Sequence, residues 1–193
     1  MSTYADWVPS SPPPARAGQV PAPAEAVIEL VNSRRHSSLE DQLDDPEFAA
    51  ELARRFAPEV DGVSPQVRKE LRGLRDALEA IVLGPATDAE LAARWRDFTA
   101  RTSNVTLRHD FSPLGQVVLR QVAGDPVIGG VALAVAQLVR SGAWSRLRIC
   151  ANGRCAHAFY DTTRSRTQRW HSYEICGNPV NVAAYRARNR QPT

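Results

Sequence analysis

All three cysteines of this 193-residue chain lie near its end, at Cys150, Cys155 and Cys176. Together with His171 they form two short pairs, C-x4-C and H-x4-C, separated by fifteen residues. Zn²⁺ binds four thiolate or imidazole donors in a tetrahedron, and two tight pairs bring such donors together with little loss of chain entropy. The spacing therefore predicts a structural zinc site in which Cys150, Cys155, His171 and Cys176 are the ligands.

Other readings of these residues explain less of the pattern. Three cysteines cannot all pair as disulfides, and a bridge is disfavoured because the N-terminal residues do not form a secretory signal. Buried free thiols are common, but they would not explain the paired spacing. His157 competes for the fourth position, since it follows Cys155 by two residues. The equal four-residue spacers within the two pairs favour His171, which leaves His157 as a loop residue or a neighbour of the ligands.

The residues after the last cysteine predict a helix that completes the metal-binding unit. Asn178 is a good N-cap, and Pro179 suits the first helical position, where no donor is needed. The helix is expected over Val180–Asn189, with Val182 and Tyr185 directed towards the metal. A zinc knuckle, a short hairpin over 157–169 and this helix together describe a treble-clef finger.

At these residues the chain resembles the CGNR-type zinc fingers, named after a Cys-Gly-Asn-Arg motif that here reads Cys176-Gly177-Asn178-Pro179. The run Phe159–Trp170 is similar to the family's loop between ligand pairs. The family usually has a cysteine directly after that tryptophan, whereas this chain has His171, which can also bind zinc. The motif's arginine is replaced by Pro179, and a lysine usual two positions later is replaced by Asn181. Both changes remove positive charge from the surface expected to meet nucleic acid.

Charge is distributed unevenly along the chain. From Arg140 onwards ten arginines accompany two acidic residues, a net charge of +8, so residues 1–139 carry −5 of the chain's total of +3. A basic tip on an acidic body indicates a polyanion partner, and arginine binds phosphate through a planar fork. The predicted nucleic-acid contacts are Arg164, Arg166, Arg169, Arg186, Arg188 and Arg190. Two simpler readings remain: Lys69 is the only lysine, so arginine abundance can reflect composition, and some arginines can brace the fold, for example Arg169 against Asp161 or Glu174.

The body before the finger is predicted to be mainly helical. Helices are expected over Glu25–Val31, after Asp45-Pro46, after Ser64-Pro65, after the capping box that begins at Thr87, and after Asp125-Pro126. Alternating apolar residues between Asn104 and Val122 predict a β-hairpin. The expected buried faces consist of Phe48, Leu52 and Phe56; Val67, Leu71, Leu74, Leu78 and Ile81; Leu91, Trp95 and Phe98; and Val127, Ile128, Val131, Val135, Leu138 and Val139.

The predicted fold class is therefore α+β and mainly α, with a helical N-terminal domain followed by a C-terminal treble-clef-like finger. Its expected parts are a disordered proline-rich tail (1–24), a helical domain (25–143) and the finger (144–190). The order of elements resembles the ABATE-type domain that precedes CGNR fingers, with short cues in A-V-I-E-L-V-N-S and L-R-G-L-R-D-A-L. No apolar run is long enough to span a membrane, and we expect a cytoplasmic protein.

The resemblance implies a bacterial transcription regulator that binds DNA through a finger whose zinc is purely structural, with a body that senses a small-molecule effector or forms a homodimer. The alternative is an enzyme or small-molecule-binding protein that retains the finger as a scaffold, with His36, His109 and His157 as acid–base candidates. No phosphate loop, dinucleotide fingerprint, nucleophile elbow or H-E-x-x-H motif supports catalysis. A protein-interaction module is a third reading.

Overall fold

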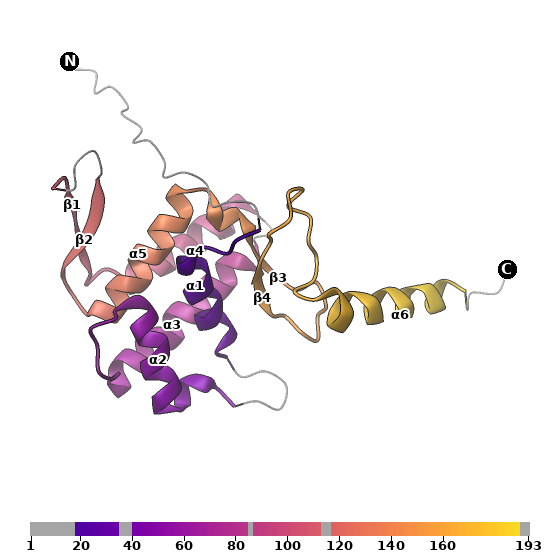
Figure 1. Cartoon of the computed structure of the whole chain (residues 1–193), viewed down its shortest axis with the longest axis horizontal. Coiled ribbons are helices and arrows are strands. Elements are labelled where there is room, and N and C mark those ends of the chain that lie inside the picture. The colour runs from indigo at the N-terminus through magenta and orange to yellow at the C-terminus, as the bar shows by residue number, and fades with distance from the viewer. Residues whose placement is uncertain (1–17, 35–39, 85–86, 113–116, 190–193) are drawn as a thin grey trace, which may run out of the picture.

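The computed structural model describes residues 18–34, 40–84, 87–112 and 117–189. Within them the chain forms six α-helices and two small antiparallel sheets, each of two strands. The helices are α1 (Ala22–Asn32), α2 (Pro46–Phe56), α3 (Pro65–Val82), α4 (Asp88–Arg101), α5 (Pro126–Arg140) and α6 (Asn178–Arg188). The strands are β1 (Thr106–Asp110), β2 (Val118–Ala123), β3 (Leu147–Ile149) and β4 (Ala158–Tyr160). The predicted α+β class, mainly helical, is confirmed (Figure 1).

Four helices of the body begin at the capping residues expected from the sequence. The side chains of Asp45, Ser64 and Asp125 each accept a hydrogen bond from a backbone N–H of the first turn that follows. Thr87 and Glu90 form a reciprocal capping box at the start of α4. These bonds satisfy amides that have no partner within the helix, and each is worth about 1 kcal/mol. α1 begins three residues earlier than expected, at Ala22, because proline is tolerated in a first helical turn.

Helices α1, α2, α3 and α5 enclose the main hydrophobic core, as Figure 1 shows. α5 is the most deeply embedded of them, and a β-carbon at its Gly130 would lie only 2.2 Å from the carbonyl oxygen of Phe56. α2 therefore packs against α5 at a distance that only glycine allows. Val139 was expected to be buried but is 48 % exposed, because it lies on the outer face of the last turn of α5. Phe48 and Phe56 are half-buried at the edge of this core.

The predicted β-hairpin is confirmed as β1 and β2, whose register pairs Leu107 with Gln121 and His109 with Leu119. It extends from the body beside α5 (Figure 1). Part of its expected turn, residues 113–116, lies outside the described residues, as do most of the proline-rich N-terminus and His36. Within the described chain, no helix is both long enough and apolar enough to cross a bilayer.

The second sheet joins the body to the finger. β3 follows α5 after a single 3-10 turn, Ala143–Arg146, and pairs with β4 in the register Leu147 to Tyr160 and Ile149 to Ala158. Ala158 and Tyr160 lie in the main core, whereas Phe159 belongs to a small second core with Cys150 and Cys176. The short linker and the shared strand fix the position of the finger on the body.

Candidate metal centre and finger surface

The four predicted zinc ligands come together at one end of the finger. One potential ligand atom from each of Cys150, Cys155, His171 and Cys176 lies within 4.8 Å of all the others. His171 presents Nδ1, which lies 3.4 Å from Sγ of Cys155 and 3.7 Å from Sγ of Cys176. A tetrahedron with zinc–sulfur bonds of 2.3 Å has edges of about 3.8 Å. The spacing and the chemistry of the donors therefore fit a structural zinc ion with three sulfur ligands and one nitrogen ligand.

The first ligand pair is held by a zinc knuckle between β3 and β4. The N–H of Cys150 donates to the carbonyl of His157 at 2.8 Å, and the N–H of Cys155 donates to that of Asn152 at 2.8 Å. Ala156 adopts a left-handed conformation, with φ of 49°, and this reverses the chain after the second ligand. The knuckle thus brings both sulfurs into the group of four donors.

The second ligand pair lies at the start of the last helix. Ser172 caps that helix by accepting from the N–H of Ile175, and the first turn, Tyr173–Gly177, is a wide π-type turn that contains Cys176. The expected N-cap at Asn178 is wrong, because the helix has already begun five residues earlier. Ser172 is the capping residue that sequence reasoning missed. Its hydroxyl also donates to the Glu174 carboxylate at 3.1 Å.

A small hydrophobic core, formed by Cys150, Phe159 and Cys176 with Trp170 packed against them, supports the metal centre. A β-carbon on Gly177 would lie 2.7 Å from Cδ2 of Tyr173 and 2.9 Å from Cε3 of Trp170. The glycine of the motif is therefore required for packing of the helix against the Trp170 ring, because no larger residue fits beneath it. The expected hairpin over 157–169 is absent: β4 pairs with β3 instead, and residues 161–170 form a loop.

The electrostatics of the thiols favour a cation at this site. Burial and the nearby Cys150 thiolate together raise the pKa of the Cys155 thiol to about 11. Burial also opposes ionisation of Cys150, but N–H donors from Asn152 and His171 bring the pKa of that thiol below its usual value. Several thiolates this close repel one another, so a bound cation is needed for all of them to be ionised at neutral pH. A zinc ion would supply that charge, and the four donors would fill its four coordination positions.

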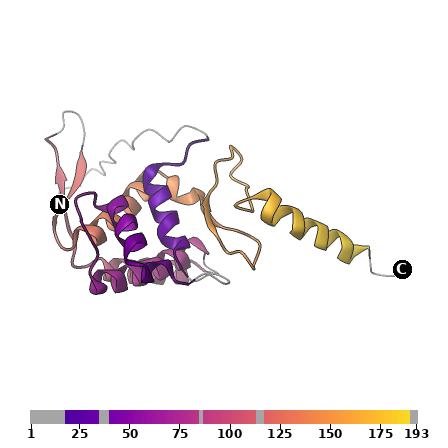
Figure 2. The same ribbon diagram turned by 60° about the horizontal axis from the view of Figure 1, so that its bottom comes forward.

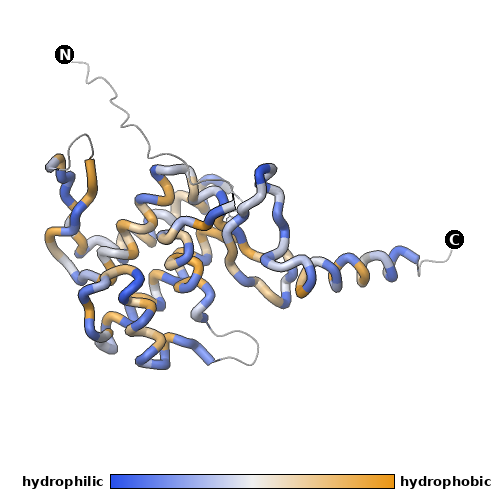
Figure 3. The backbone as a smooth tube through the Cα atoms, viewed as in Figure 1, coloured by the Kyte–Doolittle hydropathy of each residue, from blue (hydrophilic) through white to orange (hydrophobic). Residues whose placement is uncertain are grey.

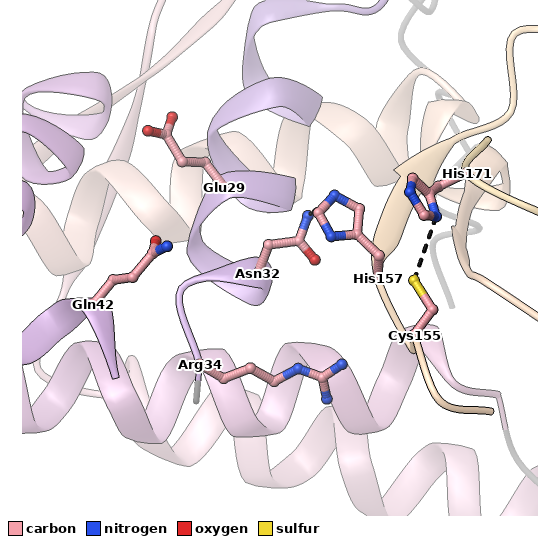
Figure 4. A pocket seen from close by; sticks show the side chains of 7 residues that line it. All are labelled: Glu29, Asn32, Arg34, Gln42, Cys155, His157 and His171. Atoms are coloured by element: carbon pink, nitrogen blue, oxygen red, sulfur yellow. Dashed lines mark hydrogen bonds between the residues drawn. The ribbon is translucent and has the colours of Figure 1, made fainter. Parts of the chain in front are cut away.

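His157 is a neighbour of the metal centre and not one of the four grouped donors. Its ring lies 4.8 Å from that of His171, and its Nε2 is 3.0 Å from Nδ2 of Asn32 (Figure 4). Asn32 also donates to the carbonyl of Ala158 at 3.0 Å and accepts from its N–H at 2.8 Å. The last residue of α1 therefore pairs with the free edge of β4 as a further strand would.

A polar pocket of about 390 Å³ opens beside the metal centre, between the body and the finger. Arg34 lies on one side, where it pairs with Glu79 and donates to the carbonyl of Ala156 at 2.5 Å. The pocket is lined by Glu29, Asn32, Arg34, Gln42, Cys155, His157 and His171 (Figure 4). Asn32 and His157 are 125 residues apart in the sequence, so no local pattern marks this pocket.

The predicted nucleic-acid residues that the structure describes are exposed on the finger. Arg164, Arg166 and Arg169 lie in the loop after β4, and Arg186 and Arg188 lie in α6. Arg190 is outside the described residues. Arg164, Arg186 and Arg188 form no ion pair with any described residue. Arg154 in the knuckle is also exposed; it has no basic neighbour in the sequence, so no cluster of arginines marks it.

Not every basic residue of the finger faces solvent freely. Arg169 lies over the Trp170 ring, 5.1 Å from its centroid, and the expected bridge from Arg169 to Asp161 is made by Arg148 instead, at 3.2 Å. Val182 and Tyr185 do not point towards the metal, as they are 38 % and 60 % exposed. α6 runs straight away from the body in both views, and every position of it whose side chain is described is exposed (Figures 1 and 2).

Comparison with known protein families supports the finger. Residues 146–189 match the CGNR zinc finger family, and this stretch contains all four clustered donors. No curated protein matches the chain. The chain therefore carries a CGNR-type zinc finger after a helical body, and the likeness of that body to the ABATE-type domain stays a prediction.

Proposed function

We propose that the protein is a transcription regulator that contacts duplex DNA through its zinc finger. The observation that supports this most is the set of exposed arginines on the finger, of which Arg164, Arg186 and Arg188 have no acidic partner among the described residues. Unpaired guanidinium groups on one protruding unit attract a polyanion, while the acidic body repels it. Together they orient the finger towards the DNA.

The shape of α6 suits a groove of duplex DNA. An α-helix with its side chains is about 10–12 Å wide, which is close to the width of the major groove. α6 is an exposed rod of eleven residues, and a helix of this length has little stability alone in water. Its basic residues would contact phosphates, and Val182 and Tyr185 on its exposed surface would contact the groove.

In this proposal zinc does no chemistry. The ion joins the knuckle, the loop after β4 and the start of α6, so it sets the positions of the arginine-bearing segments relative to one another. Four protein ligands leave no coordination position for a substrate.

The experiment is fluorescence anisotropy of zinc-loaded protein with duplex DNA over a range of salt concentrations. Arg186→Ala with Arg188→Ala should weaken binding and reduce the slope of log K against log[salt] by about two, since each phosphate contact contributes about 0.9. The matched control is Arg54→Ala with Arg96→Ala, which removes the same charge from exposed positions on the body. Equal losses in the two double variants, or no binding by the wild type, would contradict the proposal.

The pocket beside the metal centre supports a second function, binding of a small polar effector. Its lining includes a carboxylate, two carboxamides, a guanidinium group and imidazoles, which can bind a ligand that both donates and accepts hydrogen bonds. Of the acid–base candidates for catalysis, His157 lines this pocket and is bonded to Asn32, whereas His109 lies on β1 beside Phe111 and away from it. Thermal-shift screening of small polar molecules tests this function; a shift that persists in Gln42→Trp, which fills the pocket, would count against it.

A further inference from the structure

The loop between β4 and Trp170 is organised around one buried carboxylate. Asp161 is completely buried, although it is the first residue after the strand. Its Oδ1 accepts from the N–H of Thr163 at 2.9 Å and from the hydroxyl of Thr163 at 2.5 Å. Its Oδ2 accepts from the N–H of Gln168 at 3.0 Å. The two oxygens thereby bind both ends of the segment 163–168.

Two arginines of the neighbouring strand region hold the same loop from outside. Arg146 donates to the carbonyls of Asp161 and Thr163 at 2.8 and 2.9 Å. Arg148 pairs with the Asp161 carboxylate through Nε and donates to the carbonyl of Arg166 at 2.5 Å. These two guanidinium groups are engaged with the loop backbone, so they are part of the scaffold.

The arginines at the tip of the loop have the opposite role. Arg164 and Arg166 are exposed, and the backbone of Arg166 is held in the left-handed region, with φ of 54°. Figure 3 shows the loop after β4 as one of the hydrophilic segments of the finger. Glycine and asparagine adopt the left-handed region readily, but for arginine it is unfavourable unless the surrounding structure imposes it. The bonds from Thr163 and Gln168 to Asp161 fix the loop on either side of Arg166, and Arg148 donates to the carbonyl of Arg166 itself, so together they impose this conformation.

We propose that Asp161 is a positioning residue that preorganises Arg164 and Arg166 as a phosphate-contacting pair, and that Arg146 and Arg148 brace the loop and do not contact nucleic acid. This inference rests on the proposed function. Charge alone predicts that removal of the Asp161 carboxylate strengthens binding to a polyanion. The proposal predicts the opposite, because the loss of preorganisation of Arg164 and Arg166 weakens binding.

The test is a double-mutant cycle on the zinc-loaded full-length protein, read by anisotropy with duplex DNA. Asp161→Asn should lower affinity about threefold to tenfold in the wild-type background and leave it equal or slightly higher where Arg164 and Arg166 are already alanine. Glu174→Gln is the matched control, because it removes the same charge from an exposed position of the finger and should leave affinity equal or slightly higher. An unchanged or higher affinity in Asp161→Asn, or an equal loss in both backgrounds, would overturn the proposal.

Thr163→Val provides a second variant that keeps the net charge and the shape of the side chain. It removes the hydroxyl bonded to Asp161 and should lower affinity about twofold to threefold, with zinc content unchanged. If Asp161→Asn fails to fold, Thr163→Val replaces it in the double-mutant cycle. An unchanged DNA affinity of Thr163→Val in the wild-type background would refute the role of these hydrogen bonds.

Hydrogen exchange separates this inference from the proposed function. If the wild type does not bind DNA, the proposed function fails, but the amides of Thr163 and Gln168 should still exchange faster in Thr163→Val or Asp161→Asn than in the wild type. Unchanged exchange at both amides would show that Asp161 does not order the loop.

Discussion

Asn32→Ala tests how firmly the finger is fixed to the body. The substitution removes the two hydrogen bonds that the side chain shares with the backbone of Ala158 and the one with His157. Ala158 is only 3 % exposed, so its N–H and carbonyl would lose their partners in a place that water reaches poorly. Asn32 itself is half-buried, and water can enter part of the space that it leaves.

The size of the effect follows from these contacts. A hydrogen bond contributes about 1 kcal/mol net, and an unsatisfied buried backbone group costs about 1–3 kcal/mol. Alanine at the last position of α1 returns a few tenths of a kcal/mol through helix propensity. The expected loss in free energy of unfolding is therefore about 2–4 kcal/mol.

The assay is urea unfolding of zinc-saturated protein, followed by tryptophan fluorescence. Asn181→Ala, at an exposed position of α6, is the matched control and should change stability by less than about 0.5 kcal/mol. Asn32→Asp keeps the acceptor for the N–H of Ala158 and loses the donors, so it should fall between alanine and the wild type. Indistinguishable stabilities for Asn32→Ala and Asn181→Ala would refute the claim that Asn32 acts as an extra strand at β4.

Three further outcomes are expected. Chelation of zinc, or His171→Ala, should unfold the finger while the helical body retains its far-ultraviolet circular dichroism; loss of both signals together would contradict this, because the main core does not contain the ligands. Gly177→Ala should cost about 1–3 kcal/mol in finger stability through its clash with Trp170, and a neutral result by zinc-competition titration would refute the packing argument. Asp41→Asn should cost about 3 kcal/mol at neutral pH, because it leaves the buried Arg75 guanidinium without its bidentate partner. Burial opposes ionisation of Asp41, but its bonds to Arg75 bring its pKa below the usual value. The contribution is therefore full at neutral pH, begins to fall as pH drops below about 4, and is lost as pH passes through the lowered pKa; a difference between wild type and variant in urea titrations that does not shrink at all from neutral pH into this acid range would count against it.

Local patterns predicted the local features of this protein well. The caps at Asp45, Ser64, Thr87 and Asp125 act within three residues of sequence, so they could be identified directly. The four clustered donors could be predicted because zinc ligands must occur in short pairs. In each case the chemistry depends on neighbours in sequence.

The features that sequence reasoning missed depend on distant neighbours. Asn32 meets His157 across 125 residues, and nothing in the local pattern marks that contact. Asp161 could have been assigned only as a loop acid, because its burial results from Arg148 and from the fold of the loop over it. The direction of α6 was mistaken for a related reason: apolar side chains at helical spacing normally indicate a buried face, but Val182 and Tyr185 face away from both cores.

The strand β4 contributes alternate residues to two different cores, and this limits how the protein can be divided. A cut in the chain before residue 144 would separate the finger from the helices but would expose Leu147, Ala158 and Tyr160, which are covered by the body. The excised finger would therefore be prone to aggregate, and the main core of the remaining helices would lose these three side chains. A fusion that transfers this finger to another protein should therefore either provide an apolar surface that covers Leu147, Ala158 and Tyr160, or replace these three side chains with polar ones.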